Sequence, residues 1–138
     1  MINSIYEFNT KLLGVKTGKP NLLTDAEHSW LVMALQEEIE ELEEARTNES
    51  VVDCVDSLLD LAYFAIGGCV RLGLTADRIQ ECFETIHNAN MAKKMGVKQT
   101  RPQDGTVADA VKPAGWQSPE QTMFHIIFRP NRQLELPL

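Results

Sequence analysis

The sequence has little positive charge, no long apolar run and few cysteines. Against 20 Asp and Glu residues it carries only 13 Lys and Arg residues, which gives a formal net charge of -7 at pH 7. Broad binding to nucleic acid needs a basic surface that displaces counterions, so this composition argues against it. No apolar stretch is long enough to cross a bilayer. We therefore expect no direct partnership with nucleic acid or with a membrane.

The cysteines also exclude a disulfide framework. Cys54, Cys69 and Cys82 are an odd number without paired spacing, and each has apolar neighbours in a helical stretch. They are typical of small core residues in a reducing compartment. The first residues lack the basic start and apolar segment of a secretory signal. A length of 138 residues fits one domain, and we expect a cytoplasmic protein.

Helix signals dominate the first two thirds of the chain. The segment Thr24-Asp25-Ala26-Glu27 has the form of a capping box and predicts the start of a long helix. Apolar periodicity and further caps predict helices at residues 2–13, 25–46, 51–73 and 76–94. Short connections between amphipathic helices favour antiparallel neighbours. The fold class expected is therefore all-α, with a four-helix bundle-like domain over residues 1–96.

The C-terminal part of the chain is rich in Pro and Gly, which predicts an irregular segment. We expect residues 97–120 to form an ordered loop and residues 121–138 to form a tail. Ser118 and Pro119 suit the start of a short helical turn. The apolar residues 123–128 either dock on the body or pair as a strand, and the sequence does not decide between the two.

Three glutamates of the first long helix need an explanation. At about 100° per residue, Glu38 lies in the middle of an apolar stripe, with Glu41 at its edge and Glu37 a little further round. Glu40, Glu43 and Glu44 point the other way and are ordinary surface residues. Unpaired carboxylates in an apolar interior are costly, and basic residues are scarce in this part of the chain. The sequence therefore predicts a metal ion as their partner.

The next long helix repeats the pattern. One flank of its apolar face carries polar residues at helical spacing, namely Asp53, Asp56, Asp60 and Tyr63. Asp53 and Asp56 are three residues apart, as are Glu38 and Glu41, so each pair lies on one helical face. Oxygen donors without Cys or His suit Mg²⁺ or Mn²⁺ rather than zinc. The alternative is that the acids are solvated and that Asp53 only completes a cap with Ser50.

These motifs resemble those of a known enzyme family. Residues 37–42, 53–56 and 60–63 are similar to the EExxE, ExxD and DxxY motifs of the MazG-like and phosphoribosyl-ATP pyrophosphohydrolase families of all-α NTP pyrophosphatases. Asp53 stands where these families usually have Glu, and its shorter side chain would hold a metal more loosely. Asn90-Met91-Ala92-Lys93 resembles the NMSK segment, and the loop that follows it also matches. The resemblance covers about residues 8–120.

The resemblance implies a fold, a reaction and a set of roles. The reaction is hydrolysis of a (d)NTP to the monophosphate and pyrophosphate with Mg²⁺, for which Mn²⁺ substitutes. The metal ligands implied are Glu38, Glu41, Asp53 and Asp56, with Asp60 as an outer partner and Glu37 as the catalytic residue that orients or deprotonates water. Glu37 and Asp60 could exchange these roles. The substrate contacts implied are Tyr63, Asn90, Lys93 and Arg101. Catalysis is then expected in residues 1–96, and residues 97–120 are expected on the phosphate side of the substrate, while Trp30 is expected in the core.

Other functions compete with this one. Glu84 and His87 have the Glu-x-x-His spacing of di-iron bundles, although such sites need the motif on two helices. The second alternative is a non-enzymatic, dimeric helical adaptor that binds the replication clamp and whose acids only make it soluble. The apolar surface of residues 51–73 predicts a homodimer or a dimer of dimers in either case.

The last six residues, Gln133-Leu134-Glu135-Leu136-Pro137-Leu138, resemble peptides that dock bacterial replication proteins on the DNA sliding clamp. Such docking would use Gln133, Leu134, Leu136 and Leu138, and it implies a bacterial, phage or mobile-element origin. Motifs this short recur by accident, so the alternative is that these leucines pack on their own domain.

Overall fold

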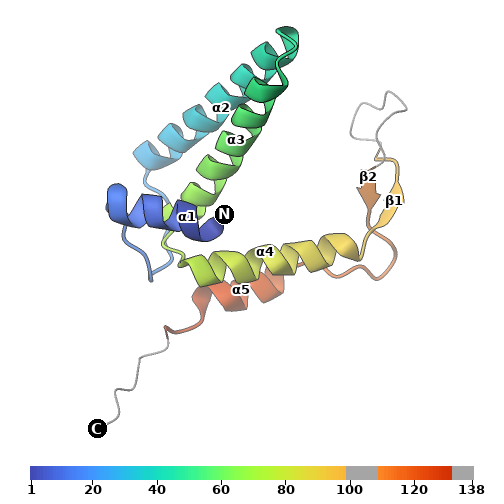
Figure 1. The fold of residues 1–138 in the computed structure, drawn as a ribbon. Helices are drawn as coiled ribbons and strands as arrows, with labels where there is room; N and C mark the ends of the chain where they lie inside the picture. Colours follow the sequence, from blue (N-terminus) through green and yellow to red (C-terminus); the bar gives the residue numbers. More distant parts are fainter. Residues whose placement is uncertain (99–108, 132–138) are drawn as a thin grey trace. The chain divides into compact units, whose positions relative to one another are not determined.

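The computed structural model describes residues 1–98 and 109–131, and the chain divides into two compact units, Met1–Ile79 and Gln80–Leu138. Figure 1 shows that helices make up most of the described chain. The elements in order are α1 (Ile2–Glu7), the π-helical turn η1 (Phe8–Leu12), α2 (Asp25–Thr47), α3 (Val51–Arg71), α4 (Ala76–Met91), β1 (Lys94–Gly96), β2 (Asp109–Val111) and α5 (Glu120–Phe128). The expected all-α fold with an irregular C-terminal segment is confirmed.

The helices α2 and α3 form a hairpin in the first unit, and they lie side by side along their length (Figure 1). The predicted capping box opens α2: Thr24 Oγ1 accepts from the Glu27 N–H at 3.2 Å, and the Thr24 N–H donates to Glu27 Oε2 at 3.0 Å. Gly68 lets the helices approach closely, because a Cβ atom there would lie 2.7 Å from Cδ2 of Leu31. The hairpin therefore holds the acidic residues of both helices close together.

The N-terminal helix differs from expectation. A single helix was expected over residues 2–13, but the chain changes from α1 to the wider π-helical turn η1 at Phe8. The wider turn places Asn9 inside the unit, where it is 4% exposed and its Nδ2 donates to the Ile5 carbonyl at 2.9 Å. Gly67 of α3 makes room for this amide, since a Cβ atom would lie 3.2 Å from Asn9 Nδ2.

The loop before α2 is attached to the end of α3. The Gly18 N–H donates to the Gly73 carbonyl at 2.8 Å, and the Asn21 N–H donates to the Leu72 carbonyl at 2.9 Å. Gly73 has a φ of +89°, and a Cβ atom at this position would lie 2.1 Å from the Lys19 carbonyl oxygen. Only glycine fits both the backbone conformation and the close approach.

The second unit contains elements that the sequence did not predict. The helix expected to reach residue 94 ends at Met91, and β1 pairs with β2 as an antiparallel hairpin with Lys94 opposite Val111. The expected loop over residues 97–120 thus contains a short strand, β2, among its described residues. Residues 123–128 belong to the helix α5, so the strand alternative is wrong. Arg129 ties the end of α5 to α4 through two hydrogen bonds to Glu81, at 2.7 and 2.5 Å.

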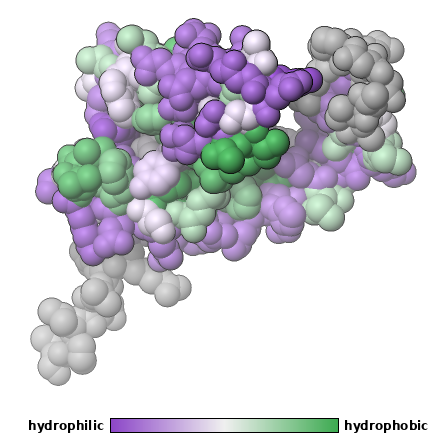
Figure 2. Space-filling model, turned by 45° about the horizontal axis from the view of Figure 1, so that its top comes forward, coloured by the Kyte–Doolittle hydropathy of each residue, from purple (hydrophilic) through white to green (hydrophobic). Residues whose placement is uncertain are grey.

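Apolar side chains remain at the surface of the α2–α3 hairpin. Figure 2 shows hydrophobic residues (green) at the surface among hydrophilic ones (purple). The exposed apolar residues of this hairpin include Val32, Met33, Ile39, Val51, Val52, Val55, Leu58 and Leu59. Cys54 and Cys69 are half-buried and Cys82 is buried, all as free thiols.

Among the described residues no single helix is long and apolar enough to cross a membrane. The bent pair of α3 and α4 taken together is long and apolar enough, by length and composition alone.

Candidate active site

Glu38 is the acidic residue that the fold buries most unfavourably. Its side chain is half-buried, and its Oε2 atom is fully buried without a hydrogen-bond partner among the described residues. An unsatisfied buried oxygen costs about 1–3 kcal/mol, and more when it is charged. The prediction that Glu38 lies on the buried stripe of α2, near Ala34 and Ala45, is confirmed.

The neighbouring carboxylates make the position of Glu38 still less favourable. Burial raises the pKa of the Glu38 carboxyl, and repulsion from Glu41, Asp60, Asp56 and Glu37 raises it further, in that order. Like charges near one carboxyl disfavour its ionised form. The hairpin thus brings these acids of α2 and α3 into one electrostatic cluster, which we call the acidic cluster.

A cavity of about 280 Å³ lies beside this cluster at the connected end of the hairpin. Its walls include Glu41, Glu44, Asp53 and Asp56. Glu44 was expected to point away from the site, and that expectation is wrong. The helical projection of α2 alone could not reveal that the start of α3 lies opposite this residue.

Ser50 caps α3 by accepting from the backbone of Asp53, and the Asp53 carboxylate takes no part in the cap. Ser50 Oγ accepts from the Asp53 N–H at 3.2 Å, whereas the Ser50 N–H donates to the Ala45 carbonyl at 3.0 Å. A capping box would need the Asp53 side chain to accept that second bond. The interpretation of Asp53 as a capping residue therefore explains its backbone and leaves its exposed side chain unexplained.

The chemistry of the acidic cluster fits a hard divalent cation. The donors are carboxylate oxygens, and the orphaned Glu38 oxygen lacks the positive partner that a buried carboxylate requires. Within residues 1–98 and 109–131, no three His, Cys, Asp or Glu side chains are arranged so that they could already hold a metal ion.

Tyr63 lies one turn beyond Asp60 on α3, within an aromatic group. Its ring meets Phe8 edge to face, with centroids 5.4 Å apart. Trp30 was expected in the core, but it is 46% exposed and its ring lies against Phe64 and under the Arg71 guanidinium, which is 4.7 Å from the ring centroid. The sequence could not show that Arg71, from the end of α3, covers this ring.

The second unit brings Asn90 and Lys93 together, because Lys93 Nζ donates to Asn90 Oδ1 at 2.7 Å. It also adds a residue that sequence reasoning missed. The ammonium groups of Lys93 and Lys112 lie 5.4 and 4.6 Å from the ring centroid of Trp116. The only sequence signal for Lys112 was its place in the segment Lys-Pro-Ala-Gly-Trp.

Some predicted residues are not placed by the structure. Arg101 and the clamp-peptide residues Gln133, Leu134, Leu136 and Leu138 lie outside the described residues. Glu84 and His87, the di-iron alternative, are both exposed on α4, and Glu84 accepts a hydrogen bond from Gln80 at 2.9 Å. In the described part of the chain, these two side chains belong to no group of three or more His, Cys, Asp or Glu residues that could hold a metal ion.

One of the comparisons with known proteins identifies a family. No curated protein matches the chain. Residues 5–90 match the phosphoribosyl-ATP pyrophosphohydrolase family, and this region contains α2, α3 and the whole acidic cluster. The match covers more than half of the chain, and the helical fold agrees with it. The chain belongs to the phosphoribosyl-ATP pyrophosphohydrolase family, within the MazG-like all-α NTP pyrophosphatases.

Proposed function

We propose that the protein is a Mg²⁺-dependent hydrolase that converts a nucleoside triphosphate into the monophosphate and pyrophosphate. The observation that carries the proposal is the buried, unpaired oxygen of Glu38 among carboxylates from two helices. A family of pyrophosphohydrolases supplies the reaction class. A contribution to stability does not explain this arrangement of carboxylates, because placing like charges close together destabilises the fold.

Glu38, Glu41, Asp53 and Asp56 would hold the cation. Bound Mg²⁺ would offset the negative charge of the phosphates and activate water as a nucleophile, and Mn²⁺ would substitute for it. Asp53 is shorter than the Glu usual at this position of the family motif, so its carboxylate reaches less far from α3. The exposed side chains of Glu41, Asp53 and Asp56 have room to turn inward when a cation draws them together.

The remaining roles fall to residues around the ligands. Water must lose a proton as its oxygen bonds to phosphorus and the linkage between the α and β phosphates breaks, and Glu37 is our candidate to accept that proton. Asp60, half-buried and close enough to raise the pKa of Glu38, would orient a ligand carboxylate or the water. Asn90 and Lys93 would contact the phosphates, and Tyr63 would contact the base. Arg101 would also contact the phosphates, a role that rests on the sequence alone because this residue lies outside the described residues.

A panel of common and deoxy nucleoside triphosphates tests the proposal. The purified protein is assayed with Mg²⁺, with Mn²⁺ and with EDTA, and the monophosphate and pyrophosphate are measured in parallel. We expect equal amounts of the two products from at least one nucleotide, and none in EDTA.

Two matched variants connect the activity to the acidic cluster. Glu38→Gln should abolish turnover, whereas Glu40→Gln removes an exposed carboxylate of the same helix and should leave kcat unchanged. Wild-type kcat in Glu38→Gln with excess Mg²⁺ would remove Glu38 from the site. A protein that neither binds Mn²⁺ nor releases pyrophosphate would instead be the non-enzymatic adaptor.

A further inference from the structure

The last helix of the second unit, α5, is apolar on most of its sides and poorly covered. Its apolar residues are Met123, Phe124, Ile126, Ile127 and Phe128. None of the nine residues of α5 is buried by the described part of the chain, and Phe124 and Phe128 are each 58% exposed. A helix of this composition is normally covered on several sides, so the described residues supply only part of its cover.

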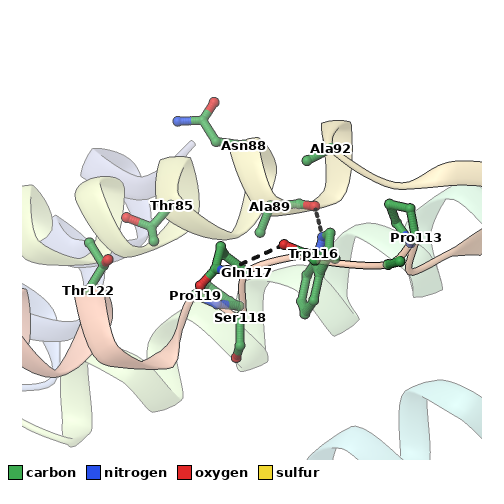
Figure 3. A pocket seen from close by; sticks show the side chains of 12 residues that line it. Thr85, Asn88, Ala89, Ala92, Pro113, Trp116, Gln117, Ser118, Pro119 and Thr122 are labelled. Atoms are coloured by element: carbon green, nitrogen blue, oxygen red, sulfur yellow. Dashed lines mark hydrogen bonds between the residues drawn. The ribbon is translucent and has the colours of Figure 1, made fainter.

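One side of α5 is occupied by α4. Figure 3 shows Thr122 of α5 facing Thr85 of α4 across one end of a pocket of about 450 Å³. At the other end of α5, Arg129 donates to the Glu81 carboxylate of α4. At 3.6 residues per turn, Arg129 lies within about 20° of Thr122 round the helix axis. These two residues therefore mark the side of α5 that faces α4.

Phe124 and Phe128 lie on the opposite side of the helix. They are about 200° and 240° round the axis from Thr122. Their rings are neighbours, with centroids 4.9 Å apart. The pair therefore points away from α4, and we call it the α5 aromatic face.

The segment before α5 is also attached to α4. The Trp116 N–H donates to the Pro113 carbonyl at 3.1 Å, in a turn where Gly115 has a φ of +77°. Beyond this turn, Trp116 Nε1 donates to the Ala89 carbonyl of α4 at 2.7 Å (Figure 3). Hydrogen bonds to α4 thus hold the chain just before and just after α5. They fix the helix in an orientation that leaves the α5 aromatic face outside.

The chain that follows α5 is long enough to turn back over this face. Residues 132–138 lie outside the described residues and begin four positions after Phe128. A chain reversal takes about two to four residues. Residues 134–138 then reach at most about 17 Å when extended, and the nine residues of α5 span about 14 Å. A returning tail can therefore run the length of the helix.

The tail also has the pattern that this face requires. Its apolar residues occupy alternate positions and would share one side of an extended segment, namely Leu134, Leu136 and Leu138. Successive leucines would be about 7 Å apart, and Phe124 and Phe128 are about 6 Å apart along the helix. Because the tail is tethered to α5, its effective concentration there is about millimolar or higher, so weak apolar contacts suffice. A second copy would instead lose translational and rotational freedom on binding.

We propose that residues 132–138 fold back over α5 and cover Phe124 and Phe128 with their three leucines. The contact is independent of the acidic cluster and of the proposed reaction. Any partner that binds these leucines first has to release them from α5. The α5 aromatic face therefore lowers the affinity of the whole protein for such a partner, relative to the free peptide.

Fluorine NMR tests this contact. The chain has five phenylalanines, so labelling with 4-fluorophenylalanine gives few signals, and single Phe→Leu variants assign those of Phe124 and Phe128. Deleting residues 133–138 should shift both signals and increase the solvent exposure of both rings, measured from the isotope shift between H₂O and D₂O. Phe8 and Phe64 belong to the first unit, and their signals should not move.

Substitutions in the full chain separate the leucines from the rest of the tail. Changing Leu134, Leu136 and Leu138 together to Ser should reproduce the effect of the deletion on Phe124 and Phe128. Glu135→Gln is the matched control, because it removes a charge between the leucines and keeps the apolar side of the tail, and it should leave the spectrum unchanged. Unchanged Phe8 and Phe64 signals show in each variant that the first unit is folded.

Two results would overturn the proposal. The first is a deletion that leaves the Phe124 and Phe128 signals and their solvent exposure as they are in the full chain. The second is an effect of the deletion that disappears when the protein is diluted, because a second copy would then cover the α5 aromatic face in place of the chain's own tail. An effect of the deletion that is the same at all protein concentrations supports the proposal.

Discussion

Glu38 opposes folding in the absence of a cation. Its buried oxygen lacks a donor, and four other carboxylates repel it. Glu38→Gln removes the charge and supplies an N–H donor, so we expect the metal-free variant to be more stable than the wild type by about 1 kcal/mol. Thermal unfolding in EDTA would show this as a Tm higher by a few degrees, about 2–8 °C.

The metal dependence of this effect identifies its cause. A cation that binds only the folded state stabilises the wild type, so added Mg²⁺ should narrow or reverse the difference in Tm from Glu38→Gln. Glu40→Gln should show the wild-type Tm in both conditions, because Glu40 is exposed. If metal-free Glu38→Gln melted below the wild type, the Glu38 carboxylate would not destabilise the metal-free fold, and this interpretation would be wrong.

At the scale of elements, the start of α2 depends on its capping box. Thr24→Ala removes the hydroxyl that accepts from the Glu27 N–H, and it should lower the free energy of unfolding by about 1 kcal/mol. Thr47→Ala is the control, because Thr47 lies in the last turn of the same helix and only donates to the Glu43 carbonyl. Urea denaturation of both variants measures the difference. A Thr24→Ala protein as stable as Thr47→Ala would contradict this role for the cap.

The stabilisation that this cap contributes should depend on pH. Hydrogen bonds from the Thr24 backbone N–H and hydroxyl lower the pKa of Glu27, and Arg71 lowers it further. Because the folded pKa lies below the unfolded value, this stabilisation is present above the unfolded pKa and is lost as the pH falls through the folded pKa. The difference in stability between the wild type and Thr24→Ala should therefore narrow on acidification.

The helices could be predicted where local chemistry determines them. Thr24 and Ser50 accept the backbone hydrogen bonds that their positions predicted, and the apolar stripe around Glu38 is where the periodicity placed it. The strands β1 and β2 could not be predicted, because each is short and forms only by pairing with a distant segment. The π-helical turn was also missed, since it depends on Gly67 of α3 making room for Asn9.

In the candidate site, too, some residues could be predicted from the sequence and others could not. The half-buried acids Glu38 of α2 and Asp60 of α3 could be found from spacing on a single helix. Glu44 was missed because it faces the start of the other helix, and Lys112 because only the turn at Gly115 brings it to Trp116. Residues that act through tertiary neighbours leave little trace in a one-dimensional pattern.

At the scale of the whole molecule, the exposed apolar residues of the α2–α3 hairpin predict self-association. Val52 and Leu59 are 77% and 59% exposed, which is unusual for aliphatic side chains in a helix with so many apolar neighbours. We expect a homodimer or a dimer of dimers, because a second copy would cover the same surface on its partner. Light scattering at micromolar concentration should report more than one chain.

A charge placed in that surface should separate the chains. Leu59→Lys puts an ammonium group among apolar side chains and should shift the protein toward the monomer. Gln36→Lys adds the same charge at an exposed polar position of α2 and should leave the assembly intact. A wild type that is a monodisperse monomer contradicts the prediction.

The C-terminal peptide predicts a larger assembly. Arg129 is anchored to Glu81 at the end of α5, so residues 133–138 follow a fixed point of the second unit. Leu134, Leu136 and Leu138 offer apolar anchors at alternate positions, and Pro137 restricts the backbone and so lowers the entropy lost on docking. We expect a peptide of residues 129–138 to bind a purified bacterial sliding clamp at micromolar concentration.

Deleting residues 133–138 should then abolish docking of the whole protein on the clamp while leaving kcat unchanged, because the acidic cluster lies on α2 and α3. A peptide with Leu134, Leu136 and Leu138 all changed to Ala keeps the charge and length of the original, so its failure to bind would assign the affinity to the apolar anchors. Docking would hold the proposed nucleotide hydrolase beside a bacterial or phage replication site, where it would remove surplus triphosphates locally. Undetectable binding of the full-length protein at clamp concentrations well above the micromolar range would return these leucines to packing within the chain.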